Sequence, residues 1–277
     1  PIVQTQGTAQ GFHFDNATMK PIINNEGWKK AFELYKATGQ YGPPDELNMD
    51  IGDTRALFKA GRCGLIVEWG DPGTLQLDDD AKSIRGKMYA ISAVGSTEVL
   101  DRSTGKLVPV SAATAPYAVD GINYAPFAAF GGWAGAVNKG ADAKTKAAAY
   151  AFLSYMNQAA QSGVDVTIGA TGYNPYRTSQ LASTDLWVKA GMPKALADNY
   201  LGAINGAINN LNMASDMKIP GAQKYTSVVL DTELARYLAG EITVDEALAN
   251  IEEGWEEVTE DFGRDEQVAS QALALGL

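Results

Sequence analysis

The sequence predicts an α/β protein of one large domain or two lobes, and two observations support this expectation. Short apolar runs typical of buried strands alternate along the chain with segments that repeat apolar residues at helical spacing. The chain also has 277 residues, of which 45% are hydrophobic and 20% are charged. This length and composition allow a sizeable buried core and exclude an intrinsically disordered chain.

Helices are predicted where a capping residue precedes apolar side chains at helical spacing. Asn24 or Asn25 can cap the first helix, Asp142 can cap a later one, and Thr243 forms a capping box with Glu246. The expected helical ranges are 27–38, 53–61, 143–158, 181–211 in two pieces, 220–238, 243–262 and a tail beyond 264. The apolar face of the helix over 143–158 includes Ala147, Tyr150, Ala151, Leu153 and Tyr155.

Strands are predicted where apolar runs are bounded by turn residues. Residues 63–69 form an apolar run that ends in a Gly-Asp-Pro-Gly turn, and we expect a buried strand there. Residues 87–94 and the glycine-rich residues 130–137 are two further strand candidates. Between them, residues 95–125 are rich in Ser, Thr, Gly and Ala, which predicts loops and short strands.

Charge and the scarcity of reactive residues exclude several classes of function. The formal net charge of −11 argues against a nucleic-acid-binding protein, which needs basic patches. The single cysteine, Cys63, allows no internal disulfide, and the single histidine, His13, is expected to be structural. The sequence has no phosphate-binding Gly-x-x-x-x-Gly-Lys-Ser/Thr loop and no Gly-x-Gly-x-x-Gly dinucleotide fingerprint. We therefore expect no cofactor, no bound metal ion and no enzymatic activity.

Three short segments place an aromatic ring beside glycines and a polar side chain at the end of a predicted strand. They are Glu68–Asp71, Phe130–Gly135 and Gly172–Arg177. Sugars and polyols present apolar C–H faces that stack on a flat ring, and hydroxyls that bond to carboxylate, amide or guanidinium groups. Glycines beside the ring let such a ligand approach the backbone. The alternative interpretation is that Trp69 and Trp133 are core residues and the glycines form turns.

Five sequence blocks together resemble one protein family. They are Phe14–Asn24 before the first helix, Phe58–Asp71 like "F-x-x-G-x-x-A-M" with a following Trp-bearing turn, Gly131–Asn138 followed by Ala147–Leu153, Gly172–Arg177 like "G-Y-x-P-x-R", and Gly240–Leu248 like "G-x-x-T-x-x-E-A-L". In this order, over residues 14–262, the chain resembles extracellular solute-binding proteins of family 1. These are the sugar-type receptors of ABC importers, similar to maltose-binding protein.

The resemblance implies an α/β fold of the periplasmic-binding-protein type II kind, with two lobes and a hinge cleft that closes on its ligand without chemistry. The implied ligand is a small neutral solute, such as a sugar, oligosaccharide or polyol, which is delivered to ABC permease subunits. The residues that match cleft-lining positions of the family are Trp69, Asp71, Gly132, Trp133, Tyr173, Arg177 and, more loosely, Tyr225.

The chain looks like the C-terminal two-thirds of such a receptor. Under the resemblance, residues 1–122 and the helical residues 171–277 form the second lobe, and residues 123–170 cross to the first lobe. The first lobe is largely absent from this chain, so we expect a missing N-terminal segment or a second chain to complete it and pair its open sheet edges. The family implies a periplasmic or extracellular location, although the chain starts at Pro1 without a signal peptide.

Two alternative functions remain open at the level of the sequence. The chain could be a sensory ectodomain or scaffold that uses the same fold without transport. It could also be a glycosidase that uses Glu68 and Asp71 as paired carboxylates, although nothing in the sequence places both on one ligand. Arg177 could equally form a structural salt bridge.

Overall fold

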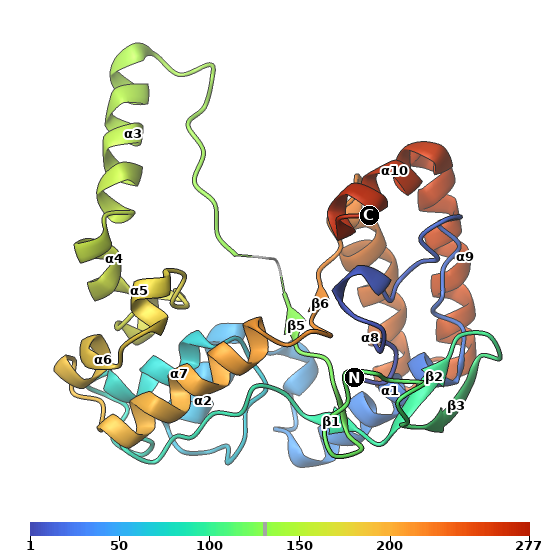
Figure 1. Cartoon of the computed structure of the whole chain (residues 1–277), viewed down its shortest axis with the longest axis horizontal. Helices are drawn as coiled ribbons and strands as arrows, with labels where there is room; N and C mark the ends of the chain where they lie inside the picture. The colour runs from blue at the N-terminus through green and yellow to red at the C-terminus, as the bar shows by residue number, and fades with distance from the viewer. Residues whose placement is uncertain (130–131) are drawn as a thin grey trace. The chain divides into compact units, whose positions relative to one another are not determined.

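The computed structural model describes residues 1–129 and 132–277, which fold as two compact units (Figure 1). Unit 1 consists of Pro1–Asn48, Ala93–Gly131 and Ala207–Leu277, and unit 2 consists of Met49–Ser92 and Gly132–Gly206. The chain therefore passes between the units four times. The predicted lobe limits at residues 122 and 170 stay a prediction.

Unit 1 is mainly helical, and its helices begin at the caps that the sequence predicts. The Asn25 side chain accepts hydrogen bonds from the backbone N–H groups of Gly27 and Trp28, and Thr243 and Glu246 form the expected capping box. The helical elements are α1 (Glu26–Thr38), α8 (Asp231–Ala239), α9 (Val244–Phe262), α10 (Arg264–Leu275), the short 3-10 turns η1 (Thr8–Gln10), η2 (Gly39–Tyr41) and η3 (Glu46–Asn48), and the π-helical turn η6 (Lys224–Leu230).

The strands of unit 1 are short and pair in twos. They are β1 (Gly95–Ser96), β2 (Glu98–Asp101), β3 (Lys106–Pro109), β4 (Asn123–Tyr124), β5 (Phe127–Ala128) and β6 (Ala214–Ser215). β1 pairs with β4 and β2 with β3 in antiparallel fashion, whereas β5 and β6 are parallel. The short strands predicted within 95–125 are thus confirmed.

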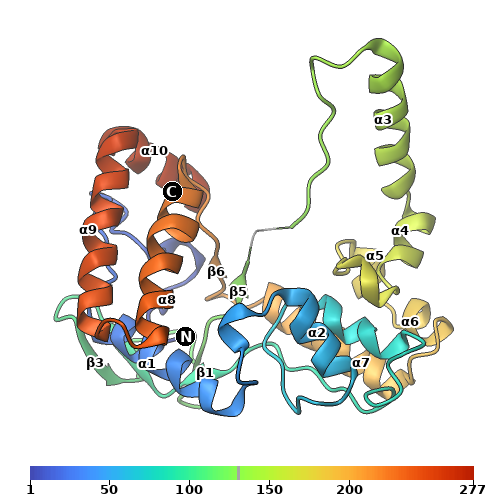
Figure 2. The ribbon, with the colours of Figure 1, turned by 180° about the vertical axis from the view of Figure 1, so that it is seen from behind.

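The core of unit 1 is aromatic and is built around α9, which packs beside α8 and α10 in both views (Figures 1 and 2). Trp255 of α9 is fully buried, and its ring lies 5.1 Å from the ring of Phe14, centroid to centroid. The indole Nε1 of Trp255 donates a hydrogen bond of 2.8 Å to the backbone oxygen of Tyr225. This bond satisfies the polar end of a large buried ring, so the core combines apolar packing with a paired N–H group.

Unit 2 consists of short helices and turns around two smaller hydrophobic clusters, one around Trp187 and one around Phe58. Its elements are α2 (Ile51–Lys59), η4 (Asp71–Leu77), α3 (Ala143–Met156), α4 (Ala159–Asp165), η5 (Gly169–Thr171), α5 (Thr178–Leu181), α6 (Asp185–Lys189) and α7 (Lys194–Ile208). Trp187 and Tyr200 meet edge to face at 6.1 Å in the larger of the two clusters. The predicted break near Gly191–Pro193 is confirmed, because α6 ends before it and α7 begins after it.

Three predicted strands are wrong for the part of the chain that the structure describes. Residues 63–69 and 87–94 contain no strand, nor do residues 132–137, while Phe130 and Gly131 lie outside the described residues. The run 63–69 is not buried either, since Leu65 is 91% exposed and Val67 is 99% exposed. A strand needs a neighbour that pairs with its backbone, and no described segment lies alongside these runs as a partner.

Helix α3 departs from the prediction in a related way. It starts after Asp142, whose side chain accepts hydrogen bonds from the N–H groups of Lys144 and Thr145, as expected. No residue of α3 is buried, however, and Tyr150 and Phe152 are 70% and 61% exposed. The helix predicted for this segment is therefore confirmed, but none of its apolar side chains is buried. Among the described helices, none is long and apolar enough to cross a membrane.

Candidate functional site

Two turns of unit 2 bring Asp71 and Tyr173 into one region. The first turn opens η4 at Asp71 and Pro72, and the second follows η5, where Gly172 adopts a left-handed conformation with φ of 71°. η4 and η5 pack so closely that a Cβ on Gly169 would lie 2.8 Å from the Cα of Leu75. Glycine is therefore needed at position 169 for the two turns to meet.

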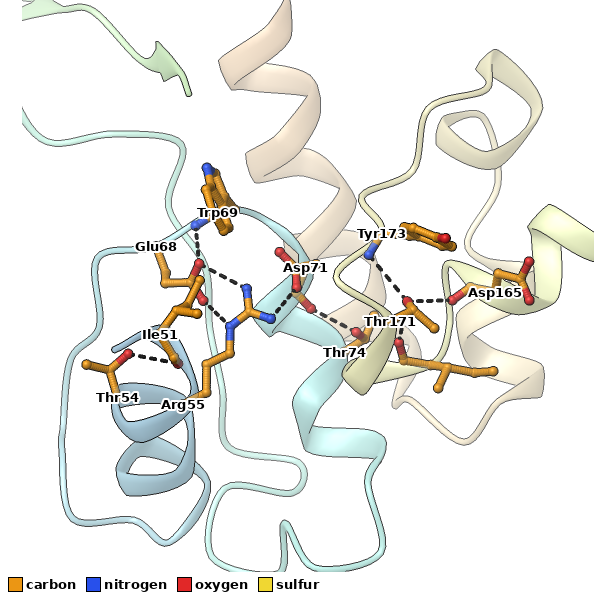
Figure 3. Close-up of polar contacts among 11 residues, drawn as sticks. Ile51, Thr54, Arg55, Glu68, Trp69, Asp71, Thr74, Asp165, Thr171 and Tyr173 are labelled. Carbon is orange, nitrogen blue, oxygen red and sulfur yellow. Dashed lines mark hydrogen bonds and ion pairs between the residues drawn. The ribbon is translucent and has the colours of Figure 1, made fainter. Parts of the chain in front are cut away.

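Arg55 connects this region to α2 through two carboxylates (Figure 3). Its Nη1 lies 2.9 Å from Oδ2 of Asp71, and its Nη2 donates a 3.0 Å hydrogen bond to Oε1 of Glu68. Its Nε also donates to Oε2 of Glu68, which makes the contact bidentate. The side chains of Arg55, Glu68 and Asp71 are 16%, 9% and 1% exposed, so this charge cluster is largely shielded from water.

Burial shapes the electrostatics of the charge cluster. Burial raises the pKa of Asp71, and the nearby Arg55 only partly opposes this. Burial alone would lower the pKa of Arg55, but its hydrogen bond to Glu68 and the charge of Asp71 outweigh that effect and raise it. Oδ1 of Asp71 has no hydrogen-bond partner among the described residues. A buried carboxylate oxygen without a partner costs free energy, which marks Asp71 as unusual for a purely structural residue.

The aromatic rings of Trp69 and Tyr173 lie on opposite sides of the Asp71 carboxylate in Figure 3. The backbone N–H of Trp69 donates a 3.0 Å hydrogen bond to Oε1 of Glu68. The backbone N–H of Tyr173 donates to Oγ1 of Thr171 at 3.3 Å. Both residues are partly buried, and Tyr173 packs against the hydrophobic cluster around Trp187. Trp69 is therefore not a fully buried core residue. Flat rings beside a carboxylate can bind a ligand that has both C–H faces and hydrogen-bond donors.

Gly132 and Trp133 do not join this cluster of residues. They lie on an extended segment before α3, where Gly132 has φ of +106° and the Trp133 side chain is 77% exposed. A Cβ on Gly132 would meet no described atom within 4 Å. Trp133 is thus exposed rather than a core residue, and its role in ligand binding stays a prediction.

Arg177 has structural partners in unit 2. Its Nε donates a 3.1 Å hydrogen bond to Oγ of Ser162, and its Nη2 donates to the backbone oxygen of Asn157. Its guanidinium also lies 5.5 Å from the ring centroid of Tyr176. These contacts connect the segment before α5 with α4 and the residue that precedes it. They are typical of a structural role, in which hydrogen bonds replace the salt bridge considered from the sequence.

Tyr225 lies in unit 1 and is fully buried in its aromatic core. Its ring meets the rings of Phe14 and Trp255 edge to face, at 5.2 and 6.3 Å. Its hydroxyl forms a 2.9 Å hydrogen bond with Oγ1 of Thr259. A ligand cannot stack on a ring that is covered in this way, so the packing gives Tyr225 a structural role and does not support the loosest of the sequence matches.

Sequence reasoning missed Arg55, which is the residue that organises the charge cluster. Arg55 lies on the helix predicted over 53–61, but it precedes Glu68 by 13 residues and Asp71 by 16. No short motif links positions at such spacings. The one usable signal is a basic residue on the helix that precedes an acidic turn, which is too common to single out a site.

The two cavities described in unit 1 lie elsewhere. One, of about 20 Å³, is lined by residues that include Gln4, His13 and Asp216, and has room for about one water molecule. The other is an open groove of about 780 Å³ along α9 that is lined mainly by carboxylates. No group of three or more His, Cys, Asp or Glu among the described residues could hold a metal ion. Neither cavity contains a predicted site residue.

Comparison with known proteins yields a likeness of fold. No protein-family model and no curated protein matches the chain. Its structure is similar to that of a "putative oligosaccharide periplasmic-binding protein" from Synechococcus sp. MITs9220, with a TM-score of 0.50 and 14% sequence identity. The match covers 92% of this chain and 56% of that one, so the chain spans little more than half of its neighbour's length. The mixed helices and strands of this chain thus follow a fold of the solute-binding-protein kind.

Proposed function

We propose that this chain binds a small hydroxyl-rich solute, such as a sugar, oligosaccharide or polyol, as part of the receptor of an ABC importer. Binding involves no chemistry, and the receptor works in the periplasm or outside the cell, where it delivers the solute to permease subunits. The likeness to a periplasmic-binding protein supports the class of function, and the site in unit 2 supports the kind of ligand.

One observation carries the proposal most directly. A buried carboxylate, Asp71, has one oxygen without a partner, and the rings of Trp69 and Tyr173 lie on its two sides. Solute hydroxyls supply donors for such an acceptor, while the C–H faces of a sugar cover aromatic rings. Trp69, Asp71 and Tyr173 are therefore the proposed ligand residues, and Arg55 holds Asp71 in place. Trp133 and Gly132 belong to the proposal as further contacts.

The proposed receptor has two lobes that close on the ligand at a hinge. Residues 1–122 and 171–277 would belong to the second lobe, and residues 123–170 would contribute to the first lobe, which this chain largely lacks. Two segments that lead between the units are paired within unit 1 as the parallel strands β5 and β6. This pairing supports a hinge in this part of the chain.

A further polypeptide, either an N-terminal segment or a second chain, would complete the first lobe. Within residues 123–170, α3 buries none of its residues, and its Tyr150 and Phe152 side chains are exposed. An uncovered helix with exposed aromatic side chains is costly in water, so a covering segment explains this feature. Hydrogen exchange tests this: we expect fast exchange of the α3 amides in the 277-residue chain.

A thermal-shift screen over sugars, polyols, amino acids and polyamines tests the proposed function. A ligand present at about 100 times its dissociation constant should add about 2.7 kcal/mol of stability. In calorimetry with a ligand found in this way, Trp69→Ala and Tyr173→Ala should each weaken binding about tenfold, because each removes a stacking surface.

The matched control is Tyr41→Ala, which removes an 85% exposed ring in unit 1. It should leave affinity unchanged. Wild-type affinity in both Trp69→Ala and Tyr173→Ala would rule out the proposed site. Turnover of a glycoside by the purified chain would favour the glycosidase alternative instead.

A further inference from the structure

The charge cluster at the proposed site is not neutral. Arg55 is the one cation that forms ion pairs with Glu68 and Asp71 among the described residues. The nearby Lys59 is paired with Asp78 and Asp80 instead. With all three groups ionised, one guanidinium faces two carboxylates, so the cluster carries one net negative charge.

The unbalanced charge is located at Asp71. Both oxygens of Glu68 accept hydrogen bonds from Arg55, whereas Asp71 is paired through Oδ2 alone. Its Oδ1 has no hydrogen-bond partner among the described residues, although the side chain is 1% exposed. In Figure 3 this oxygen lies on the side of the carboxylate away from Arg55, between the labelled side chains of Trp69 and Tyr173 in this view.

The two rings favour the same kind of ligand group as the free carboxylate oxygen. The faces of tryptophan and tyrosine rings attract cations, with Trp the stronger of the two. Trp69 and Tyr173 therefore add to the attraction that Asp71 exerts on a positive charge. Because Asp71 is shielded from water, salt screens its field less than it screens the field of a surface carboxylate.

We propose that the solute carries an ammonium group beside its hydroxyls, which makes an amino sugar the preferred ligand class of this site. This rests on the proposed function and narrows it, since the sequence predicts a neutral solute. The ammonium neutralises the negative charge of the cluster and supplies up to three N–H donors. The same negative charge repels the carboxylate of an anionic sugar and weakens its binding.

Calorimetry with four matched sugars tests the inference on the wild-type chain. Glucosamine, with its amine protonated, should bind about tenfold tighter than glucose or N-acetylglucosamine, and glucuronate should bind weakest. A tenfold difference in affinity corresponds to the attraction between two opposite unit charges about 6 Å apart at an effective dielectric constant of about 40. The galactose, galactosamine and galacturonate series repeats the comparison with another hydroxyl pattern.

Asp71→Asn identifies the group responsible, because it keeps the size of the side chain and removes its charge. The preference for the amine should fall from about tenfold to less than twofold. The control is Asp198→Asn, which removes a carboxylate from the surface of the same unit and should keep the tenfold preference. If Asp71→Asn does not fold, Glu68→Gln changes the net charge of the same cluster and should reduce the preference in the same direction.

The outcomes separate this inference from the proposed function. If glucose or N-acetylglucosamine binds as tightly as glucosamine, the ammonium preference is overturned while sugar binding stands. A tenfold preference that survives in Asp71→Asn would also overturn it. If no sugar of either series binds and the wider solute screen is negative as well, the proposed function fails together with the inference.

Discussion

Replacing Arg55 with alanine should destabilise unit 2 strongly, because it leaves two shielded carboxylates without a cation. Asp71 is 1% exposed and Glu68 is 9% exposed, so neither is well solvated once the guanidinium is gone. Removing one partner of a buried ion pair costs about 3–5 kcal/mol. We expect about 3 kcal/mol here, since Arg55 itself is 16% exposed.

Urea unfolding at pH 7, followed by circular dichroism, measures this loss. With a typical slope of about 1–3 kcal/mol per molar urea, the midpoint of the unit 2 transition should fall by about 1 M or more. Hydrogen exchange of peptides from α2 and η4 assigns the transition to this region. At acid pH the difference should shrink, because protonation removes the unpaired charges.

The control for Arg55→Ala is Lys194→Ala in the same unit. Lys194 forms an ion pair with Asp198 on the surface, where the two side chains are 71% and 52% exposed. Such pairs contribute only about 0.2–1 kcal/mol. If Arg55→Ala shifts the midpoint no further than Lys194→Ala, the charge cluster does not stabilise the turn that carries Asp71, and the reasoning about the site is refuted.

Two other predictions concern the turns of the site and the single histidine. Gly169→Ala should lower the free energy of unfolding by about 1–3 kcal/mol, because its Cβ would press against the backbone of Leu75; Gly202→Ala, in open space on α7, should raise it by up to about 1 kcal/mol. Thermal denaturation measures both, and equal effects would contradict the close approach of the turns. Burial lowers the pKa of His13 to about 4, opposed by the charge of Asp216, so the unfolded chain binds more protons than the folded one between pH 6.5 and 4. Stability should therefore fall as pH decreases through that window, and this dependence should be weaker in His13→Gln; an identical pH profile in both proteins would rule it out.

The helices could be read from the sequence because their signals are local. Asn25, Asp142 and Thr243 cap the helices that follow them, and each cap bonds to backbone groups within three residues. The strand predicted over 63–69 failed because a strand depends on a partner elsewhere in space, which no local pattern supplies. The apolar face of α3 was read correctly as a pattern, but its burial depends on a neighbour that the described residues do not provide.

The candidate site could be predicted in part for the same reason. Trp69, Asp71 and Tyr173 stood out because rings beside glycines at turns form a local pattern. Arg55 did not, since its contacts with Glu68 and Asp71 join separate segments of the chain. The burial of Tyr225 could not be foreseen either, because it follows from the packing of η6 against α9.

The central claim is that a hydroxyl-bearing solute binds at Trp69 in unit 2, and nuclear magnetic resonance of the tryptophan indole N–H groups tests it most directly. The chain has five tryptophans, so the five indole signals can be assigned by single Trp→Phe substitutions. Titration with glucosamine and with neutral oligosaccharides should shift the Trp69 signal in a saturable manner and leave the buried Trp187 and Trp255 unchanged. A Trp69 signal that stays fixed while a sugar binds, or that moves no more than those of Trp187 and Trp255, would contradict the account.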